Sequence, residues 1–480
     1  MSKENYTMLI DFYELTMANG YFNSKMRDEI TYFDMFYRTI PDKGGFAVAA
    51  GLEQLIDYIQ NLRFSEEDIN YLRSKNLFSE EFLEYLKNFK FHGDIYAVPE
   101  GTVVFPNEPL ITVKANAIEA QIIETYLLLA INHQSLIATK AARIVRAAKG
   151  RQVMELGSRR AQGESAAVLG ARAAYIAGVN GTACAMSDMR YGVPAYGTMA
   201  HSWVQMFKTE YEAFETYCKI YPNNVTLLVD TYNVLKSGVP NAIKAIKNVL
   251  WPLGIKKCAI RLDSGDITYL SKAARKMLDE AGLTDCKIVV SNSLDENLIG
   301  HVLANGAQID SFGVGERLIT AKSDPVFGGV YKLCAIEHKG EIIPKIKISE
   351  NEQKIINPHF KKIYRIYSKD NNKALADLLC VYDETINENE DLEIFDQYFT
   401  WKRKTITNFY VKELQQPIFV NGKLVYKQPT IEEIREYHKQ EIETLWDEVK
   451  RFENPHEYYV DLSQKLWDIK NNLLSQFSKK

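Results

Sequence analysis

The sequence predicts an α/β protein whose middle part is a parallel sheet or barrel. Short apolar runs recur between residues 146 and 329, and helical stretches separate them, which is typical of βα units. The part before these runs mixes helical and strand-like patterns, and the part after about residue 330 is first β-rich and then helical. We expect an N-terminal α/β domain at 1–145 that residues 330–400 complete, an α/β barrel at 146–329, and a mostly helical region at 401–480.

The N-terminal part contains both kinds of element. Runs rich in β-formers occur at 30–36, 95–98 and 102–105. Helical periodicity occurs at 51–63 and 79–89. From 117 to 149 the helical pattern is almost unbroken, and it ends at Gly150, a residue type that commonly ends helices. The domain boundary is therefore expected near 140–150.

The middle part alternates strands and helices. The expected strands lie at 153–156, 225–229, 258–260, 287–290 and 309–314. The expected helices include 161–177, 242–249 and 270–281. Active sites of barrels assemble at the carboxyl ends of the strands. We therefore expect the residues at or just beyond these ends to face one common site, namely Glu155, Asp230, Asp263, Ser291 and Gly313.

The C-terminal part is predicted to contain a few strands and then helices. Residues 342–348 and 361–366 have the pattern of strands, and residues 430–477 are charged, aromatic and mostly helical. No repeat and no Ser/Gly-rich linker occurs, so the domains are expected to pack closely.

Composition and charge exclude several classes of protein. With 46% hydrophobic and 25% charged residues, the chain is near the average of soluble globular proteins. A net charge of -4 provides no general attraction to nucleic acid or to an anionic membrane, and neither is expected as a partner. The polar start excludes a secretory signal, and the dispersed cysteines form no C-x-x-C pair. We expect a cytoplasmic protein with reduced thiols.

His201 is the first candidate catalytic residue. It lies in the small-residue segment Gly-Thr-Met-Ala-His-Ser-Trp at 197–203, which also contains Thr198. A lone histidine is more often structural than catalytic, but the strand-end carboxylate of Asp230 favours catalysis. Such a carboxylate can receive one ring N–H and leave the other nitrogen nucleophilic.

Two further motifs follow strands. Arg-Leu-Asp-Ser-Gly-Asp at 261–266 concentrates three charges beside a glycine, which suits anion or Mg²⁺ handling as well as it suits a solvated turn. Gly313, Gly315 and Glu316 follow a later strand, where glycines let backbone N–H groups approach a phosphate, although a tight turn is equally compatible. With the serines after the preceding strand, the candidate phosphate-binding set is Ser291, Ser293, Gly313, Gly315 and Glu316.

A pair of arginines follows the first barrel strand. Arg159 and Arg160 lie in Gly-Ser-Arg-Arg-Ala-Gln-Gly at 157–163. Adjacent arginines are usually a solvated surface cluster. At the carboxyl end of a strand they would instead direct guanidinium groups toward a carboxylate or phosphate.

In their order along the chain, these motifs are similar to the nicotinate phosphoribosyltransferase family. The resemblance begins with Leu-Ile-Asp-Phe-Tyr-Glu-Leu-Thr-Met at 9–17 and continues through GSRRAQG, GTMAHSW, LLVDTYN, RLDSGD and FGVGERLIT. It implies a type II phosphoribosyltransferase, with an irregular α/β barrel beside an α/β domain. It also implies a homodimer whose sites lie at the subunit junction, and the substrates nicotinate, phosphoribosyl pyrophosphate and ATP, with Mg²⁺.

The resemblance also implies roles for single residues. His201 matches a histidine that becomes phosphorylated, and Asp230 matches its carboxylate partner. Arg261 and Asp263 match residues that face the substrate. Four further residues are predicted to bind substrate, namely Arg159, Arg160, Thr182 and Thr198. Tyr13 matches an aromatic residue that stacks on the pyridine ring across the dimer. Two positions depart from the family pattern, Asn233, where an aspartate is common, and Glu316.

Two other functions are compatible with the same scaffold. The first is a nicotinamide phosphoribosyltransferase, but those enzymes carry an aspartate where this chain has Ala183, after Gly181 and Thr182. The second is a catalytically silent binding protein of the same fold. The presence of His201, Asp230, Arg261 and Asp263 argues against the second.

Overall fold

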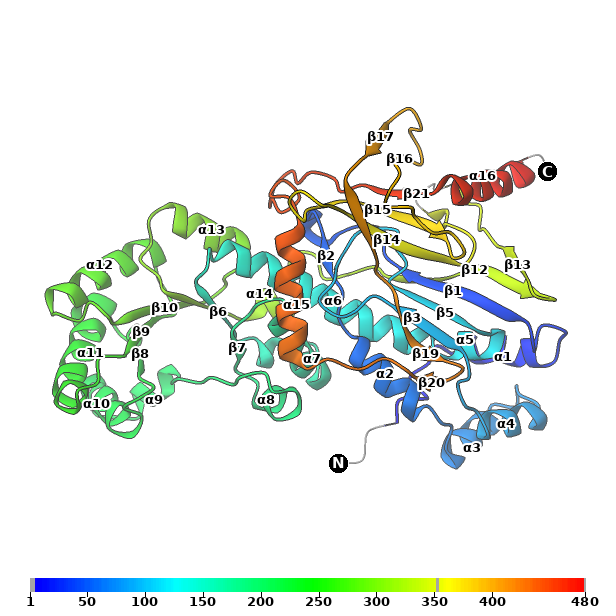
Figure 1. The fold of residues 1–480 in the computed structure, drawn as a ribbon. Coiled ribbons are helices and arrows are strands. Elements are labelled where there is room, and N and C mark those ends of the chain that lie inside the picture. Colours follow the sequence, from blue (N-terminus) through cyan, green and yellow to red (C-terminus); the bar gives the residue numbers. More distant parts are fainter. Residues whose placement is uncertain (1–4, 351–353, 479–480) are drawn as a thin grey trace. The chain divides into compact units, whose positions relative to one another are not determined.

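The computed structural model describes residues 5–350 and 354–478 and divides the chain into two compact units (Figure 1). The first unit contains the residues up to Leu136 together with those from Val326 onward, and the second contains Ile137–Pro325. The boundary falls inside one long helix, α6 (Glu124–Ala147). It therefore lies earlier than the 145/146 expected from the sequence. Gly150, which follows this helix, has a φ of 81°, as expected for a glycine at a helix end.

The first unit contains a seven-stranded antiparallel sheet. Its strands are β1 (Ile30–Phe36), β3 (Asp94–Ala97), β5 (Ile111–Asn116), β12 (Val330–His338), β13 (Glu341–Pro344), β19 (Gln416–Val420) and β20 (Lys423–Leu424). Their order is β13-β12-β1-β5-β3-β19-β20. β1 covers the predicted run 30–36, and it pairs with both β5 and β12. The sheet therefore joins strands from both ends of the chain.

A second, four-stranded sheet of this unit is built from β14 (Lys361–Ser368), β15 (Ala374–Val381), β18 (Phe409–Glu413) and β21 (Val460–Leu462). Two small antiparallel pairs complete the strands of this unit, β2 (Ala47–Val48) with β4 (Val103–Val104), and β16 (Leu392–Phe395) with β17 (Arg403–Ile406). The prediction of a mostly helical region from 401 onward is wrong for 403–424, where β17, β18, β19 and β20 lie. β18 pairs with β14 and β19 pairs with β3, so local periodicity does not reveal these two strands. β17 and β20 pair with their sequence neighbours β16 and β19.

The helices of the first unit are α1 (Phe12–Phe22), α2 (Leu52–Asn61), α3 (Glu66–Ser74), α4 (Glu80–Lys87), α5 (Ala117–Ile122), α15 (Ile431–Thr444) and α16 (Gln464–Ser478). α3 and α15 begin with capping boxes, Ser65 with Asp68 and Thr430 with Glu433, which satisfy backbone N–H groups of the first turn. Within the described residues, no helix is both long and apolar enough to cross a membrane.

The second unit contains a six-stranded parallel sheet. Its strands are β6 (Gln152–Glu155), β7 (Gly181–Thr182), β8 (Thr226–Leu228), β9 (Ala259–Leu262), β10 (Lys287–Ser291) and β11 (Ser311–Val314). The order is β7-β6-β11-β10-β9-β8, and every neighbouring pair is parallel. The five strands predicted for this part are confirmed. Because all six run in one direction, their carboxyl ends lie at one edge of the sheet.

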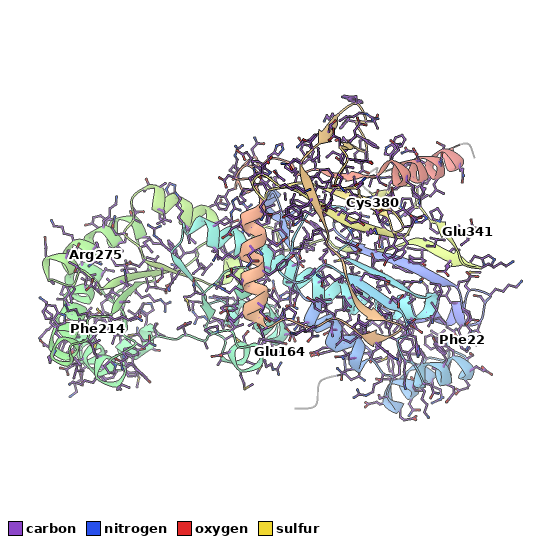
Figure 2. The ribbon with its side chains drawn as sticks, in the orientation of Figure 1. Phe22, Glu164, Phe214, Arg275, Glu341 and Cys380 are labelled. Carbon is purple, nitrogen blue, oxygen red and sulfur yellow. The ribbon has the colours of Figure 1, made fainter. Side chains whose placement is uncertain are left out.

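The helices of the second unit are α7 (Glu164–Ile176), α8 (Ala185–Tyr191), α9 (His201–Gln205), α10 (Glu210–Ile220), α11 (Val239–Ala245), α12 (Ile267–Glu280), α13 (Glu296–Ala304) and α14 (Glu316–Ile319). α12 packs against β9 and β10. Arg275 of α12, labelled in Figure 2, donates from Nη1 to the carbonyl of Cys286 at 2.6 Å and from Nη2 to that of Leu283 at 2.7 Å. These bonds tie α12 to the segment that begins β10.

Candidate active site

Several candidate residues of the second unit lie at the carboxyl edge of the parallel sheet. Glu155 ends β6, Thr182 ends β7, Asp230 lies two residues beyond β8, and Ser291 ends β10. Arg261 lies on β9 and Asp263 directly follows it. The parallel topology therefore places these strand ends at one edge of the sheet, and that they form one site remains a prediction.

Arg261, Asp263 and Ser291 form a closed hydrogen-bonded group. The guanidinium of Arg261 donates from Nη2 to Oδ1 of Asp263 at 3.0 Å and from Nε to Oγ of Ser291 at 2.8 Å. Ser291, which is only 3% exposed, in turn donates to the same Oδ1 of Asp263. Each of the three side chains thus restrains the other two, and Asp263 keeps its second oxygen, Oδ2, outside this group.

His201 is held between a hydroxyl and a carboxylate. It is the first residue of α9, and its Nδ1 lies 3.1 Å from Oγ1 of Thr231. On the other side of the ring, Nε2 lies 3.8 Å from Oδ2 of Asp263. With 40% of its side chain exposed, the ring is accessible from solvent while both nitrogens have a defined neighbour. This suits a histidine that reacts with a ligand.

The predicted pairing of Asp230 with His201 is not what the structure shows. Oδ2 of Asp230 accepts from the backbone N–H of Asp263 at 3.1 Å and from Oγ of Ser264 at 2.5 Å. Its Oδ1 is buried and has no hydrogen-bond partner in the described part of the chain. Asp230 therefore anchors the segment after β9, because the backbone of Asp263 comes closer to it than the imidazole does. The carboxylate nearest to His201 is Asp263.

Part of the RLDSGD motif has a structural role in the turn after β9. Gly265 has a φ of 82°, a conformation that residues with a side chain rarely adopt. Asp266 caps α12 by accepting from the backbone N–H of Tyr269 at 3.0 Å. Of the charges in this motif, Arg261 and Asp263 belong to the site and Asp266 starts the helix.

The predicted phosphate-binding residues differ in burial and in their contacts. Ser291 is buried and uses its hydroxyl on Arg261 and Asp263, so it is not free for a phosphate. Gly313 lies inside β11, between two paired strands, and a Cβ there would come within 2.4 Å of Cδ1 of Leu156. A glycine is needed at position 313 because a larger residue would collide with Leu156. Its backbone is paired in the sheet and is not free to bind a ligand.

The other predicted phosphate-binding residues lie beyond the strand ends. Ser293 is exposed after β10, where both it and Asn292 have positive φ values of 51° and 90°. Gly315 precedes the short helix α14. Glu316 pairs with Lys322 at 2.6 Å, and the pKa of Glu316 is lowered, mainly by its hydrogen bond from this ammonium. Asn233, the other departure from the family pattern, accepts from the backbone N–H of Lys236 at 2.8 Å and caps a helical turn.

Glu155 connects two strand ends. Its carboxylate accepts from the hydroxyl of Thr182 at 2.6 Å and from the backbone N–H of Gly157. Burial raises the pKa of Glu155, and the hydrogen bonds from Thr182 and Gly157 oppose that shift. Thr182 is therefore a buried partner of Glu155, while Arg159 and Arg160 are exposed on the turn that follows Gly157.

The two remaining candidates, Thr198 and Tyr13, lie in different units. Thr198 is exposed, and its Oγ1 lies 3.5 Å from Nη1 of Arg261, at the long end of the hydrogen-bond range. Tyr13 belongs to the first unit, on α1, and is 47% exposed. Burial of its hydroxyl, together with the charges of Glu124 and Glu14, raises the pKa of Tyr13. The ring is thus accessible and lies near acidic side chains.

A group of cations in the first unit is not among the residues predicted from the sequence. A cavity of about 450 Å³ is lined by five basic side chains together with Leu333, Ile346 and Ile356, and these five are Arg38, Lys332, Lys345, Lys347 and Lys354. Such a cavity suits a polyanion. The alternation of Lys345 and Lys347 in the sequence, which places both on one face of an extended segment, was the available signal.

A unit of parallel strands that carries a histidine, an arginine and two aspartates at its carboxyl edge defines an α/β enzyme. Models of the nicotinate phosphoribosyltransferase N-terminal and C-terminal domains match residues 8–132 and 360–470, and a nicotinate phosphoribosyltransferase of Bacillus subtilis is 44% identical over 96% of this chain and 93% of its own length. The chain belongs to the nicotinate phosphoribosyltransferase family.

Further comparisons agree with this assignment. A nicotinate phosphoribosyltransferase of Mycobacterium tuberculosis is 38% identical, over 96% of this chain and 92% of its own length. The crystal structure of human nicotinic acid phosphoribosyltransferase superimposes with a TM-score of 0.83 and 26% identity, covering 97% of this chain and all of that one. The mixed α/β fold predicted from the sequence is thereby confirmed.

Proposed function

We propose that the protein joins nicotinate to the ribose phosphate of phosphoribosyl pyrophosphate, forms nicotinate mononucleotide and releases pyrophosphate. The observation that carries the proposal is the convergence of Arg261, Asp263 and His201 at one edge of the parallel sheet. The names of the B. subtilis and M. tuberculosis relatives supply the substrate. As part of the same proposal, the second unit is an irregular α/β barrel, because barrel enzymes carry their sites at this edge.

The side chains present suit this reaction. The bond between C1 of the ribose and pyrophosphate breaks while a bond from C1 to the pyridine nitrogen forms, so positive charge develops on the sugar and negative charge on the leaving group. The carboxylates of Asp230 and Asp263 stabilise the positive sugar. Arg261, which is oriented by Ser291 and Asp263, stabilises the negative leaving group.

Mg²⁺ is proposed to enter with the phosphates of the substrate. It prefers carboxylate and phosphate oxygens and is usually bound by one or two carboxylates plus substrate phosphates. Asp263, with Oδ2 outside the hydrogen-bonded group, and Asp230, with an unpartnered Oδ1, provide this donor chemistry. When bound, the ion neutralises charge on the pyrophosphate, while Arg261 and Asp263 keep their own roles in orientation.

ATP is proposed to phosphorylate His201. The exposed ring has a defined partner at each nitrogen, which suits a nucleophilic histidine. A phosphoryl group adds roughly -1.5 to -2 charges. Attached to Nε2, which lies 3.8 Å from Oδ2 of Asp263, this charge would alter the binding of the substrate phosphates and the release of product.

A homodimer with shared sites is also part of the proposal. Exposed apolar side chains gather around the start of α1 and on α6, namely Leu9, Phe12, Tyr13, Met17 and Leu129. The backbone N–H of Asp11 donates to Oγ1 of Thr125 at 3.1 Å, so the two segments adjoin. Such a surface suits a second copy of the chain. The partner would then contribute Tyr13 and the basic cavity around Lys332 and Lys345.

A product assay tests the proposed function directly. The purified protein is supplied with phosphoribosyl pyrophosphate, Mg²⁺ and either nicotinate or nicotinamide, each with and without ATP. We expect nicotinate mononucleotide, faster formation with ATP, and little product from nicotinamide. Mononucleotide formation from nicotinamide at a higher kcat/KM would instead identify a nicotinamide enzyme, and the lack of either product would contradict transferase activity.

The choice between nicotinate and nicotinamide should depend on the ends of β6 and β7. A charged hydrogen bond contributes roughly 1.5–3 kcal/mol, so losing the arginine that binds the carboxylate should lower the nicotinate preference about ten- to a hundredfold. We expect Arg159→Ala or Arg160→Ala to have this effect, and Ala183→Asp to act in the same direction by repelling the carboxylate. The measurement is the ratio of kcat/KM for the two substrates. Unchanged ratios in all three variants would place the pyridine pocket elsewhere.

A further inference from the structure

Thr231 makes the closest polar contact to the reactive histidine. Its Oγ1 lies 3.1 Å from Nδ1 of His201, although the two residues are 30 positions apart. Thr231 directly follows Asp230, whose carboxylate is bound by the backbone N–H of Asp263 and the hydroxyl of Ser264. The threonine is therefore attached to an anchored strand end. The histidine begins a short helix, so the contact joins two separately positioned elements.

The two sides of the ring differ in their chemistry. At Nδ1 the neighbour is a neutral hydroxyl within hydrogen-bond distance, whereas at Nε2 the neighbour is the carboxylate of Asp263 at 3.8 Å, beyond that distance. A neutral imidazole carries one N–H and one lone pair, and the hydrogen bond at one nitrogen decides which nitrogen keeps the lone pair. A hydroxyl that accepts the Nδ1 proton leaves the lone pair on Nε2, on the side of Asp263.

We propose that Thr231 is the positioning residue that fixes the tautomer of His201 for phosphoryl transfer. This inference rests on the proposed function. The Nε2 lone pair attacks the γ-phosphorus of ATP, an N–P bond forms, the bond from that phosphorus to the bridging oxygen breaks, and ADP leaves with the electron pair. No proton leaves Nδ1 in this step. The positive charge that the ring acquires strengthens the hydrogen bond from Nδ1 to Thr231, so the threonine stabilises the transition state more than the ground state.

The test compares two substitutions of the threonine with a matched control. Thr231→Val keeps the shape and removes the hydroxyl, Thr231→Ser keeps the hydroxyl, and Thr284→Val makes the same change at an exposed turn. The net contribution of one hydrogen bond corresponds to a rate effect of about threefold to tenfold. We expect Thr231→Val to slow transfer of the γ-phosphoryl group to His201 by this factor, Thr231→Ser to restore the rate, and Thr284→Val to leave it unchanged. The KM for ATP should change little.

A spectroscopic measurement reports on the tautomer without any turnover. With ¹⁵N-labelled histidine, His201→Gln identifies the two ring signals of His201 among those of the eight histidines. We expect well-separated nitrogen shifts in the wild-type protein and in Thr231→Ser, and shifts that move toward each other in Thr231→Val because both tautomers become populated.

The outcomes separate the inference from the function on which it rests. A wild-type protein that never acquires phosphate from ATP would contradict ATP coupling, and the nitrogen shifts would then decide the role of Thr231 alone. Unaltered shifts in Thr231→Val, or a Thr231→Ser variant as slow as Thr231→Val, would overturn the inference. If Thr231→Val has a much lower melting temperature than Thr284→Val, its slow transfer is not used as evidence. The rate of Thr231→Ser and the nitrogen shifts of His201 then decide the inference.

Discussion

Replacing Asp263 with asparagine is expected to lower kcat/KM for nicotinate mononucleotide formation by about a hundredfold to a thousandfold. The loss of one oriented electrostatic group in an active site typically has an effect of this size. Oδ1 of Asp263 accepts from Arg261 and Ser291 together, and Oδ2 is the carboxylate oxygen nearest to His201. An amide removes the negative charge and can place its NH₂ group against the donors of Arg261. The measurement is steady-state kinetics with and without ATP, and both rates should fall.

The same motif offers a matched control. Asp266 lies three residues further on and caps α12 through the backbone N–H of Tyr269. Asparagine caps helices about as well as aspartate, so Asp266→Asn should retain both activity and melting temperature. Equal losses in Asp263→Asn and Asp266→Asn would show that the motif acts through folding alone. Full activity of Asp263→Asn would remove this carboxylate from the reaction.

The position of the site could be predicted because it depends on strand direction. The runs that became β8, β9 and β10 are short, apolar and separated by helical stretches, and this pattern is local enough to recognise in one sequence. Once the strands are parallel, their carboxyl ends must share an edge, so Asp230, Asp263 and Ser291 are brought together without further information.

The partners within the site could not be predicted, because they depend on geometry at the scale of a single hydrogen bond. Asp230 and Thr231 are adjacent in sequence, yet the hydroxyl faces His201 and the carboxylate faces the backbone of Asp263. Ser291 was predicted to bind phosphate, but its burial between Arg261 and Asp263 is a consequence of neighbouring strands. Similarly, the packing of Leu156 against Gly313 decides the role of that glycine.

Strand pairings between segments far apart in the sequence also could not be predicted. β19 joins β3 across more than three hundred residues, and β21 adds in parallel to β15. Neither pairing leaves a local signal, because the partner strand supplies the hydrogen bonds that a short run lacks. The basic cavity has the same origin, since Arg38 and Lys345 meet only after the sheet has formed.

Incubation with ATP and Mg²⁺ is expected to add an acid-labile, base-stable phosphate to the protein, and His201→Ala is expected to abolish it completely. The reason is that the ring of His201 is accessible and has a partner at each nitrogen, so that one can hold a proton while the other attacks. The label is measured with ATP carrying a radioactive γ-phosphate. His301→Ala, which removes an exposed histidine from α13 of the same unit, should leave the label intact.

Transfer without ATP provides the second half of this prediction. Hydrogen bonds join the side chains of Arg261, Asp263 and Ser291 to one another, and none of these bonds involves His201. The arrangement of the three side chains should therefore survive the loss of the imidazole. We therefore expect His201→Ala to retain basal nicotinate mononucleotide formation while losing all stimulation by ATP. A residue that couples ATP to the reaction should affect the stimulation by ATP and not the basal rate. The reason is that its phosphorylation changes the charge beside the substrate phosphates, whereas the residue forms no bond to the pyridine. A His201→Ala protein that still carries the label would assign phosphorylation to another side chain, and one that loses basal transfer as well would place His201 in the transfer reaction itself.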